Sequence, residues 1–154
     1  MINSISLKPR SILLSLVASL AAIVYAGTIS KPSFAQSKIY NPILLQAGTQ
    51  ISDRLTSQDI PTGEGGFARD YIVSLAAGDQ VVIDVISEEF DTIVILMDTN
   101  GTTVAENDDG PDGSTNSLLF TRITKAGNYI VRVRAFGETT GGAFKLKVTR
   151  LKPV

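Results

Sequence analysis

The sequence predicts an all-β fold, namely a two-sheet antiparallel β-sandwich with jelly-roll-like topology and about eight strands. Three observations lead to this prediction. Short runs in which apolar and polar residues alternate recur along the chain, as expected of strands with one buried face. These runs are nearly evenly spaced, and turns rich in Gly, Pro, Asn and Asp separate them, which is typical of sandwiches and barrels. No stretch after residue 50 shows a convincing helical period.

The first 35 residues are predicted to be a signal peptide rather than part of the fold. Lys8 and Arg10 precede an uncharged apolar run over residues 11–27, which is the layout of a secretory signal. The small residues Ser33 and Ala35 fit a cleavage site that releases a chain beginning at Gln36. Cleavage after Ala26 and an uncleaved anchor are the alternatives. We therefore expect a bacterial protein that is secreted or periplasmic, with no membrane span after cleavage.

Residues 36–50 are expected to form an extended, partly ordered lead-in, and residues 51–154 the sandwich domain. Removing residues 1–35 leaves 154 − 35 = 119 residues, enough for one domain with its own core. All 15 acids lie after residue 35 and three of the 14 cations lie before it, so the predicted mature net charge is 11 − 15 = −4. A mildly acidic domain is a poor nucleic-acid binder, because phosphate contacts need clustered Lys and Arg. The chain has no Cys, so no disulfide supports the fold.

The predicted strands cover residues 51–57, 67–75, 80–87, 92–97, 102–106, 117–123, 128–136 and 143–151. Most alternate; the 92–97 run is almost wholly apolar and is expected at the centre of a sheet. Residues 59–66 read as a loop from their Pro and Gly content, and residues 107–116 as a loop without periodicity. Asn100-Gly101 closes a hairpin between two runs. The alternation predicts a buried set that comprises Ile83, Leu96, Tyr129, Val131 and Phe144.

Several short motifs follow one another in a characteristic order along the predicted strands and turns. They are Phe90-Asp91-Thr92, Asp98-x-x-Gly101, Ala105-x-Asn107-Asp108-Asp109, Ser117 and Ala126-Gly127-x-Tyr129-x-Val131-x-Val133. In order and spacing they resemble the bacterial pre-peptidase C-terminal domain, over about residues 67–151. The resemblance implies a jelly-roll-like sandwich that is usually appended to secreted proteases and other extracellular enzymes. It implies a non-catalytic role in substrate or matrix binding, secretion or solubility. Here we expect a standalone member, so a separately encoded secreted enzyme is one candidate partner.

Composition also bears on catalysis. The chain has no His, so Ser-His-Asp and Cys-His nucleophilic sites cannot be assembled, and zinc loses its usual ligands. We expect a non-enzymatic binding or accessory module for an extracellular protein or polysaccharide. A structural cell-envelope protein is the alternative, and a small carboxylate-dependent hydrolase is the third.

One acidic loop has the composition of a metal site. The candidate calcium ligands are Asp91, Asn107, Asp108, Asp109 and Asp112, since calcium takes six to eight oxygen ligands and Gly110 and Gly113 let the backbone bend. Some relatives in the family that the chain resembles, such as clostridial collagen-binding domains, bind calcium. The alternative is a solvated turn, because Asp, Asn, Gly and Pro are ordinary loop residues.

A second surface hypothesis concerns basic residues on two strands that follow each other in the sequence. Arg132 and Arg134 share one strand face, and Lys145 and Lys147 alternate in the same way on the next strand. If these strands were paired, the four cations would form a basic stripe facing sulfated or acidic polymers. The alternative is a solvated sheet face that neighbouring acids balance.

Overall fold

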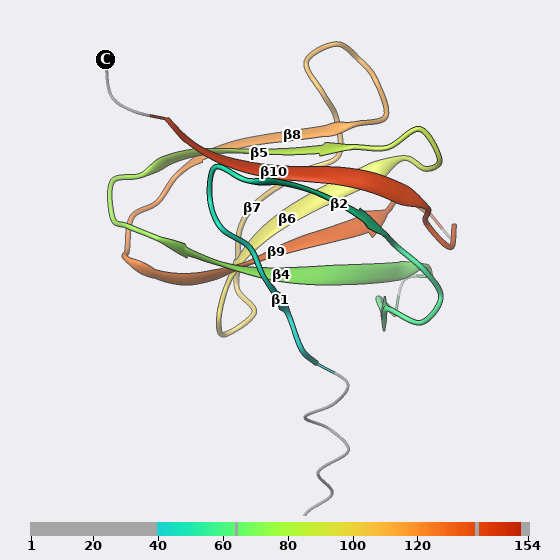
Figure 1. The fold of residues 1–154 in the computed structure, drawn as a ribbon, viewed down its shortest axis with the longest axis horizontal. Coiled ribbons are helices and arrows are strands. Elements are labelled where there is room, and N and C mark those ends of the chain that lie inside the picture. Colours follow the sequence, from blue (N-terminus) through green and yellow to red (C-terminus); the bar gives the residue numbers. More distant parts are fainter. Residues whose placement is uncertain (1–39, 64, 138, 152–154) are drawn as a thin grey trace, which may run out of the picture. The chain divides into compact units, whose positions relative to one another are not determined.

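The computed structural model describes residues 40–151 except residues 64 and 138, and the predicted signal peptide lies outside them. The described chain contains strands and no helix, and therefore no helix able to cross a membrane. The strands form two facing layers (Figure 1). Their bounds are β1 (Ile43–Leu44), β2 (Gln50–Arg54), β3 (Ile60–Pro61), β4 (Phe67–Leu75), β5 (Gln80–Ile86), β6 (Thr92–Asp98), β7 (Thr103–Asn107), β8 (Ser117–Arg122), β9 (Gly127–Ala135) and β10 (Ala143–Leu151).

The strand order is that of a jelly roll. Sheet A has the order β1-β4-β9-β6-β7, with β3 also paired to β4, and sheet B has the order β2-β10-β5-β8. Without the two-residue strands β1 and β3, eight strands remain. In chain order, the second, seventh, fourth and fifth of them form sheet A, and the first, eighth, third and sixth form sheet B. Consecutive strands therefore mostly alternate between sheets, which confirms the predicted all-β sandwich.

The segment before β2 is more integrated than the expected lead-in. Ile43 and Leu44 pair in parallel with Tyr71 and Ile72 of β4, so sheet A is not wholly antiparallel. Leu45 follows them and is only 3% exposed within the core. A second short strand, β3, lies in the predicted loop over 59–66. Two-residue strands have no periodicity for sequence analysis to detect.

The eight longer strands lie where the alternation predicts them. β4 and β10 have the predicted bounds, and the largest difference is at the end of β2. That strand ends at Arg54 because the backbone N–H of Thr56 donates to Asp59 Oδ2 at 2.8 Å and turns the chain. Asn100-Gly101 closes the β6–β7 hairpin as expected, with Gly101 at a φ of 87°.

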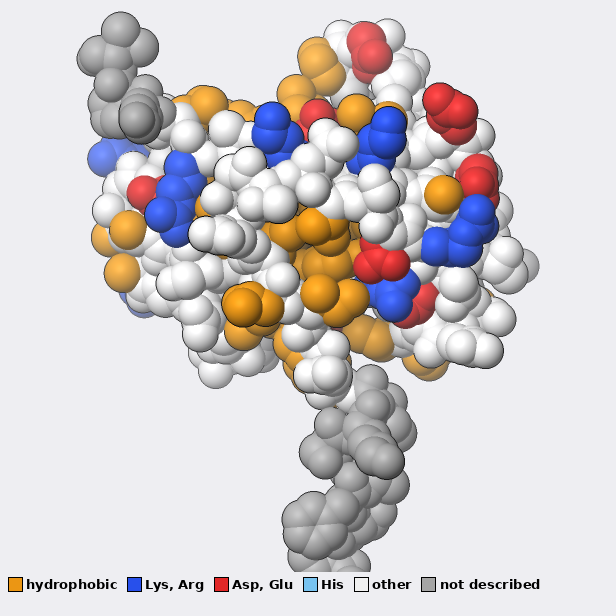
Figure 2. Space-filling model, viewed as in Figure 1, with side chains coloured by type: hydrophobic (Ala, Val, Ile, Leu, Met, Phe, Trp, Pro, Cys, Tyr) orange, Lys and Arg blue, Asp and Glu red, His pale blue; other side chains and the backbone are white. Residues whose placement is uncertain are grey.

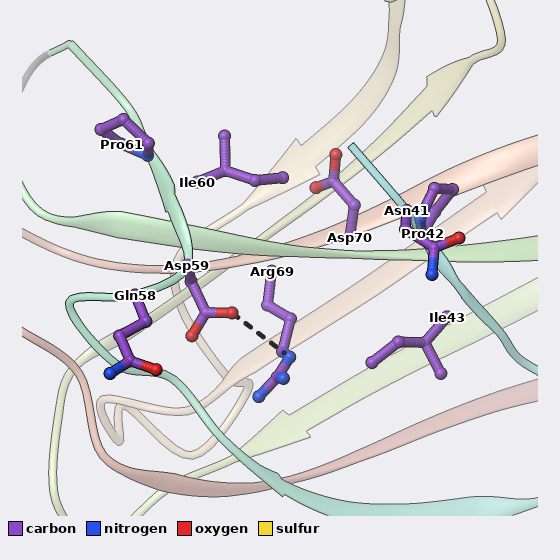
Figure 3. Close-up of a pocket in the computed structure, with 9 residues that line it drawn as sticks. All are labelled: Asn41, Pro42, Ile43, Gln58, Asp59, Ile60, Pro61, Arg69 and Asp70. Carbon is purple, nitrogen blue, oxygen red and sulfur yellow. Dashed lines mark ion pairs between the residues drawn. The ribbon is translucent and has the colours of Figure 1, made fainter. Parts of the chain in front are cut away.

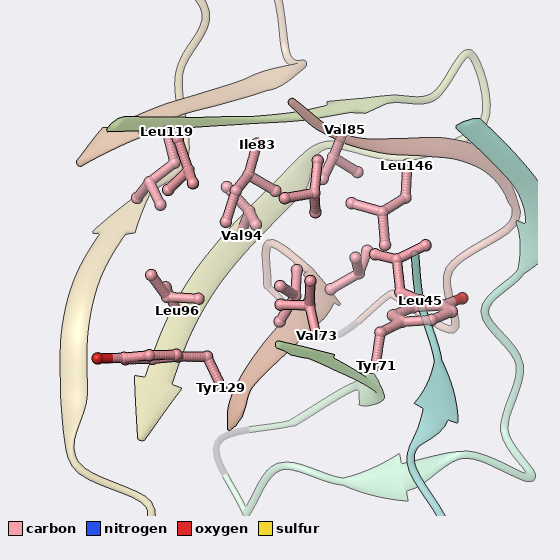
Figure 4. Packing of buried hydrophobic residues seen from close by; sticks show 14 of the residues in the cluster. Leu45, Tyr71, Val73, Ile83, Val85, Val94, Leu96, Leu119, Tyr129 and Leu146 are labelled. Carbon is pink, nitrogen blue, oxygen red and sulfur yellow. The ribbon is translucent and has the colours of Figure 1, made fainter. Parts of the chain in front are cut away.

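The core lies between the sheets and confirms the predicted strand register. All five predicted core residues are buried: Ile83, Leu96, Tyr129, Val131 and Phe144. Figure 4 shows such side chains from both layers meeting in one cluster. The ring of Phe144 packs edge-on against the rings of Tyr71 and Phe90, at centroid distances of 6.4 and 6.2 Å. Such aromatic pairs add stabilisation beyond the area they bury.

Two buried hydroxyl groups join the sheets where β6 and β8 begin. Thr92 and Ser117 are both fully buried, and their hydroxyl oxygens lie 2.7 Å apart. The Ser117 hydroxyl donates to the Thr92 carbonyl at 2.7 Å, while the Thr92 N–H donates to the Thr115 carbonyl at 2.9 Å. Because every group in this pair has a partner, burying it is not penalised as an unsatisfied polar contact would be.

Candidate functional site

Four of the five predicted calcium ligands lie at the end of β7 and in the acidic loop that joins it to β8. Asn107 Nδ2 donates to the carbonyls of Asp109 and Leu118, both at 2.8 Å, and so ties the loop to β8. Asp112 Oδ1 accepts from the hydroxyl of Ser114 at 2.7 Å and from its N–H at 3.2 Å. These bonds hold the pKa of Asp112 below its ordinary value. Two of the five candidate side chains therefore shape the loop itself.

Asp91 approaches this loop from the start of β6. Burial raises the pKa of Asp91, and the charges of Asp108 and Asp109 raise it further, so these three carboxylates interact. Among the residues that the structure describes, however, no three acidic side chains are grouped closely enough to hold a metal ion. The calcium site stays a prediction from the sequence.

A hollow of about 540 Å³ lies at the edge of β4 (Figure 3). β1 pairs with β4 at residues 71–72 and β3 pairs with it at residues 67–68, so Arg69 and Asp70 lie between the two short strands. The residues that line this hollow are Asn41, Pro42, Ile43, Gln58, Asp59, Ile60, Pro61, Arg69 and Asp70. It therefore combines charged groups with apolar walls. We call it the β4 hollow.

Ion pairs fix the charged side of the β4 hollow. Arg69 Nη1 lies 2.9 Å from Asp53 Oδ1, and Arg69 Nε lies 3.4 Å from Asp59 Oδ1, the pair dashed in Figure 3. Asp59 Oδ2 also accepts from the backbone N–H and the hydroxyl of Thr56 at 2.8 and 3.1 Å. Since Arg69 is shared by two carboxylates, the group carries one net negative charge and a defined geometry.

Asp70 is held on the outward side of sheet A by a bidentate pair. Arg132 Nε and Nη2 donate to its two carboxylate oxygens at 2.7 and 2.8 Å, and the Asp70 side chain is 1% exposed. Burial raises the pKa of the neighbouring Tyr40 phenol, and the Asp70 charge raises it further. Sequence reasoning missed this ion pair and the hollow. The sequence shows Asp70 and Arg132 as opposite charges on two strands, but it does not show that these strands are neighbours.

One comparison with known proteins matches part of the sandwich to a known family. Residues 68–135 match the family described as the bacterial pre-peptidase C-terminal domain. This part of the chain is therefore similar to that family. The match confirms the resemblance given by the sequence motifs, although it ends at Ala135 rather than extending through β10. No curated protein matches the chain.

Two solved structures share the fold of this chain. The pre-peptidase C-terminal domain of a Bacillus anthracis collagenase is 16% identical, with a TM-score of 0.54, and the match covers 70% of this chain and 94% of that one. PliG of Aeromonas hydrophila, a periplasmic inhibitor of g-type lysozyme, is 12% identical, with a TM-score of 0.50, and the match covers 72% of this chain and 100% of that one. At these identities the likeness establishes a sandwich fold and no shared ligand.

The sandwich does not form the basic stripe expected from the sequence. Arg132 and Arg134 are on β9 in sheet A, where they pair with Asp70 and Glu106. Lys145 and Lys147 are on β10, which pairs with β2 and β5 in sheet B. The stripe hypothesis is wrong, because strands that follow each other in a jelly roll generally belong to opposite sheets.

Proposed function

We propose that this protein, whose sandwich is similar to the bacterial pre-peptidase C-terminal domain, is a secreted, non-enzymatic binding module for an extracellular protein or polysaccharide. The observation that carries the proposal is the β4 hollow. Its volume of about 540 Å³ falls within the range of ligand sites, and it combines apolar walls with a few fixed polar groups. The ion pairs of Arg69 set this geometry before any ligand arrives, which lowers the entropic cost of binding.

The chemistry of the chain supports binding rather than catalysis. The sequence has no His and no Cys, so the common nucleophile–base pairs have no base. The buried hydroxyls of Thr92 and Ser117 bond to each other and to backbone carbonyls, away from solvent. A family whose domains are non-catalytic agrees with this reading.

We infer that the protein works in the periplasm or the medium after cleavage at Ala35. The basic residues, apolar run and small-residue site at the N-terminus support export. N-terminal sequencing of the exported protein should begin at Gln36, and recovery of intact Met1 from the membrane fraction would contradict this. PliG, which has a similar fold, is an inhibitor of g-type lysozyme, and this supports a separately encoded secreted enzyme as one candidate partner.

The test is a pull-down with matrix polysaccharides and with envelope protein fractions. Gln58 lines the β4 hollow and is exposed, so Gln58→Trp should fill the hollow without disturbing the core. Ser57→Trp is the matched control, because Ser57 is an exposed neighbour that does not line the hollow. We expect the wild type and Ser57→Trp to retain a ligand that Gln58→Trp loses. Equal retention by both variants would remove the hollow from the proposal.

A structural role in the cell envelope is the second candidate, and a specific surface favours it. Tyr40, Ile43 and Leu44 are 47%, 40% and 83% exposed along the β1 edge of sheet A. An apolar sheet edge can pair with another chain. In that case the protein should self-associate with increasing concentration in sedimentation experiments, and Leu44→Lys should abolish the association. A monomer at all concentrations would exclude self-assembly.

A further inference from the structure

Most of the described cations that form no salt bridge lie on the outward face of sheet B. In the part of the chain that the structure describes, the cations that form no salt bridge are Arg122, Lys125, Lys145 and Lys147. Three of them occupy exposed outward positions on β8 and β10, and Lys125 lies in the turn after β8. Figure 2 shows basic side chains over β10 along the upper margin of the molecule.

The strand register places an apolar strip among these cations. Val82 pairs with Phe120 on one side and with Thr149 on the other. In the next outward row, Asp84 pairs with Leu118 and Lys147. Because paired side chains on one face lie about 5 Å apart, the rows form one continuous surface. We call it the sheet B face, and its residues are Val82, Asp84, Leu118, Phe120, Arg122, Lys145, Lys147 and Thr149.

Phe120 is the feature of this face that ordinary packing does not explain. Its side chain is 60% exposed, whereas the aromatic rings of Tyr71 and Phe144 are buried in the core. An aromatic ring beside Val82 and Leu118 offers an apolar platform for the C–H face of a sugar ring. Thr149 and Asp84 supply hydroxyl and carboxylate partners for sugar hydroxyls on the same surface.

We propose that the sheet B face binds an anionic polysaccharide, with Phe120 stacking on a sugar ring and Arg122, Lys145 and Lys147 pairing with its acidic groups. This inference rests on the proposed binding role and assigns it a ligand class and a surface separate from the β4 hollow. Charge complementarity favours an anionic polymer, since three of the residues of this face are cations and one, Asp84, is an acid. A flat sheet suits a polymer lying across several rows rather than a small molecule enclosed in a pocket.

Asp84 favours a polysaccharide over a membrane surface. It is half-buried in the middle of the face, where burial raises its pKa and the charge of Lys147 opposes that rise. A carboxyl group at this position can bond sugar hydroxyls, but against anionic lipid it adds repulsion and desolvation at the centre of the contact. A single exposed aromatic residue also gives little apolar area for insertion into lipid.

The experiment measures retention of the purified, folded protein on immobilised polygalacturonate, with dextran as the neutral polymer and phosphatidylglycerol vesicles as the lipid probe. We expect retention on polygalacturonate at low salt that weakens as sodium chloride rises, because exposed charge pairs are screened. Retention on dextran should be much weaker, and vesicle binding should be absent.

Variants then locate the contact. Lys147→Gln and Arg122→Gln should each weaken polygalacturonate binding about two- to fivefold, the range for an exposed charge pair. Phe120→Ala should weaken it by a similar factor and leave the melting temperature nearly unchanged. Arg54→Gln is the charge-matched control, because Glu89 already neutralises Arg54 through bonds of 2.9 and 3.0 Å. Val104→Ala is the apolar control, because Val104 on β7 is 44% exposed and lies in sheet A.

Each other outcome overturns the inference. Equal binding by the wild type and the face variants would show that the contact lies elsewhere, and preference for phosphatidylglycerol vesicles would indicate a membrane surface. If polygalacturonate is not retained while a neutral polysaccharide or an envelope protein is retained and then lost in Gln58→Trp, this inference fails and the proposed binding function stands. If no polymer and no envelope component is retained, both fail.

Discussion

The hydroxyl of Tyr71 donates a 2.8 Å hydrogen bond to Asp53 Oδ2 and so connects sheet A with sheet B. Asp53 in turn accepts from Arg69 Nη1 at 2.9 Å through its other oxygen, which links the core directly to the charged wall of the β4 hollow. Tyr71 is fully buried, whereas Asp53 is partly exposed. Core packing and hollow geometry therefore share one carboxylate.

We expect Tyr71→Phe to lower the free energy of unfolding by about 1.5 kcal/mol, the lower end of the range for hydrogen bonds to charged groups, because Asp53 keeps Arg69 as a partner. Tyr129→Phe is the matched control, since the Tyr129 hydroxyl donates to the neutral carbonyl of Lys125 at 2.7 Å. Its loss should be smaller, on the order of 0.5–1 kcal/mol. Urea unfolding measures both, and an equal or larger loss in Tyr129→Phe would contradict the assignment.

The same residue predicts a pH dependence at alkaline pH. Burial, the bond to Asp53 and the charge of Asp53 raise the pKa of Tyr71 well above its ordinary value. Its contribution to stability is therefore complete below pH ~10, where the unfolded phenol is still protonated, and falls as pH rises from there towards the folded pKa. Between about pH 10 and 12 the wild type should lose more unfolding free energy than Tyr71→Phe. Parallel curves over that range would show that the phenol is not protected.

The pair between Asp70 and Arg132 should be the most costly ion pair to break. Asp70→Asn should destabilise the fold by about 2–4 kcal/mol, somewhat below the range for fully buried pairs because the Arg132 side chain is 27% exposed. Glu106→Gln is the control on the same sheet, since the Arg134–Glu106 contact is 3.5 Å and the Glu106 side chain is 44% exposed. That change should cost under about 1 kcal/mol. Thermal unfolding that ranks the two variants in the opposite order would contradict this reading.

Sequence reasoning succeeded where the information is local. The alternation around Tyr71 and Val131 determines which face is buried, because a one-residue slip would expose the whole set. It failed where the answer depends on which strands are neighbours. Arg132 and Lys145 lie on consecutive strands, yet the jelly roll assigns them to different sheets, while Asp70 and Arg132 meet across 62 residues of sequence. β1 and β3 escaped detection because each contains two residues.

The register of β6 can be tested at Leu96, which is fully buried at the centre of the sandwich (Figure 4). Leu96→Ala should lower the free energy of unfolding by about 2–5 kcal/mol, since removing the side chain loses transfer free energy and leaves a cavity. Leu44→Ala is the matched control, because Leu44 is 83% exposed, and it should change stability by under about 0.5 kcal/mol. A loss in Leu96→Ala as small as in the control would place Leu96 outside the core.

The Asp91 carboxyl beside the acidic loop should make the stability of the fold depend on pH. Burial and the charges of Asp108 and Asp109 raise the pKa of Asp91, so its protonated form is favoured in the folded protein. A raised carboxyl pKa contributes stability that is complete below pH ~4 and is lost as pH rises through the folded pKa. At neutral pH the ionised Asp91 therefore costs stability, and Asp91→Asn should melt at the same temperature as the wild type or higher. This advantage should disappear as the pH falls towards 4.

Calcium should relieve the same repulsion by drawing the exposed carboxylates of Asp108 and Asp109 towards Asp91. We expect the melting temperature of the wild type to be higher in about 10 mM calcium, roughly ten times the Kd of weak extracellular sites, than in chelator. Calcium at about ten times its Kd adds about 1.4 kcal/mol to the free energy of unfolding. Magnesium should have a smaller effect, because it demands a stricter octahedral geometry. The double variant Asp108→Asn, Asp109→Asn should keep the fold and lose the calcium response. If the melting temperature of the wild type is the same in chelator and in calcium, the loop is a solvated turn, in which Asn107 and Asp112 make only the hydrogen bonds described above.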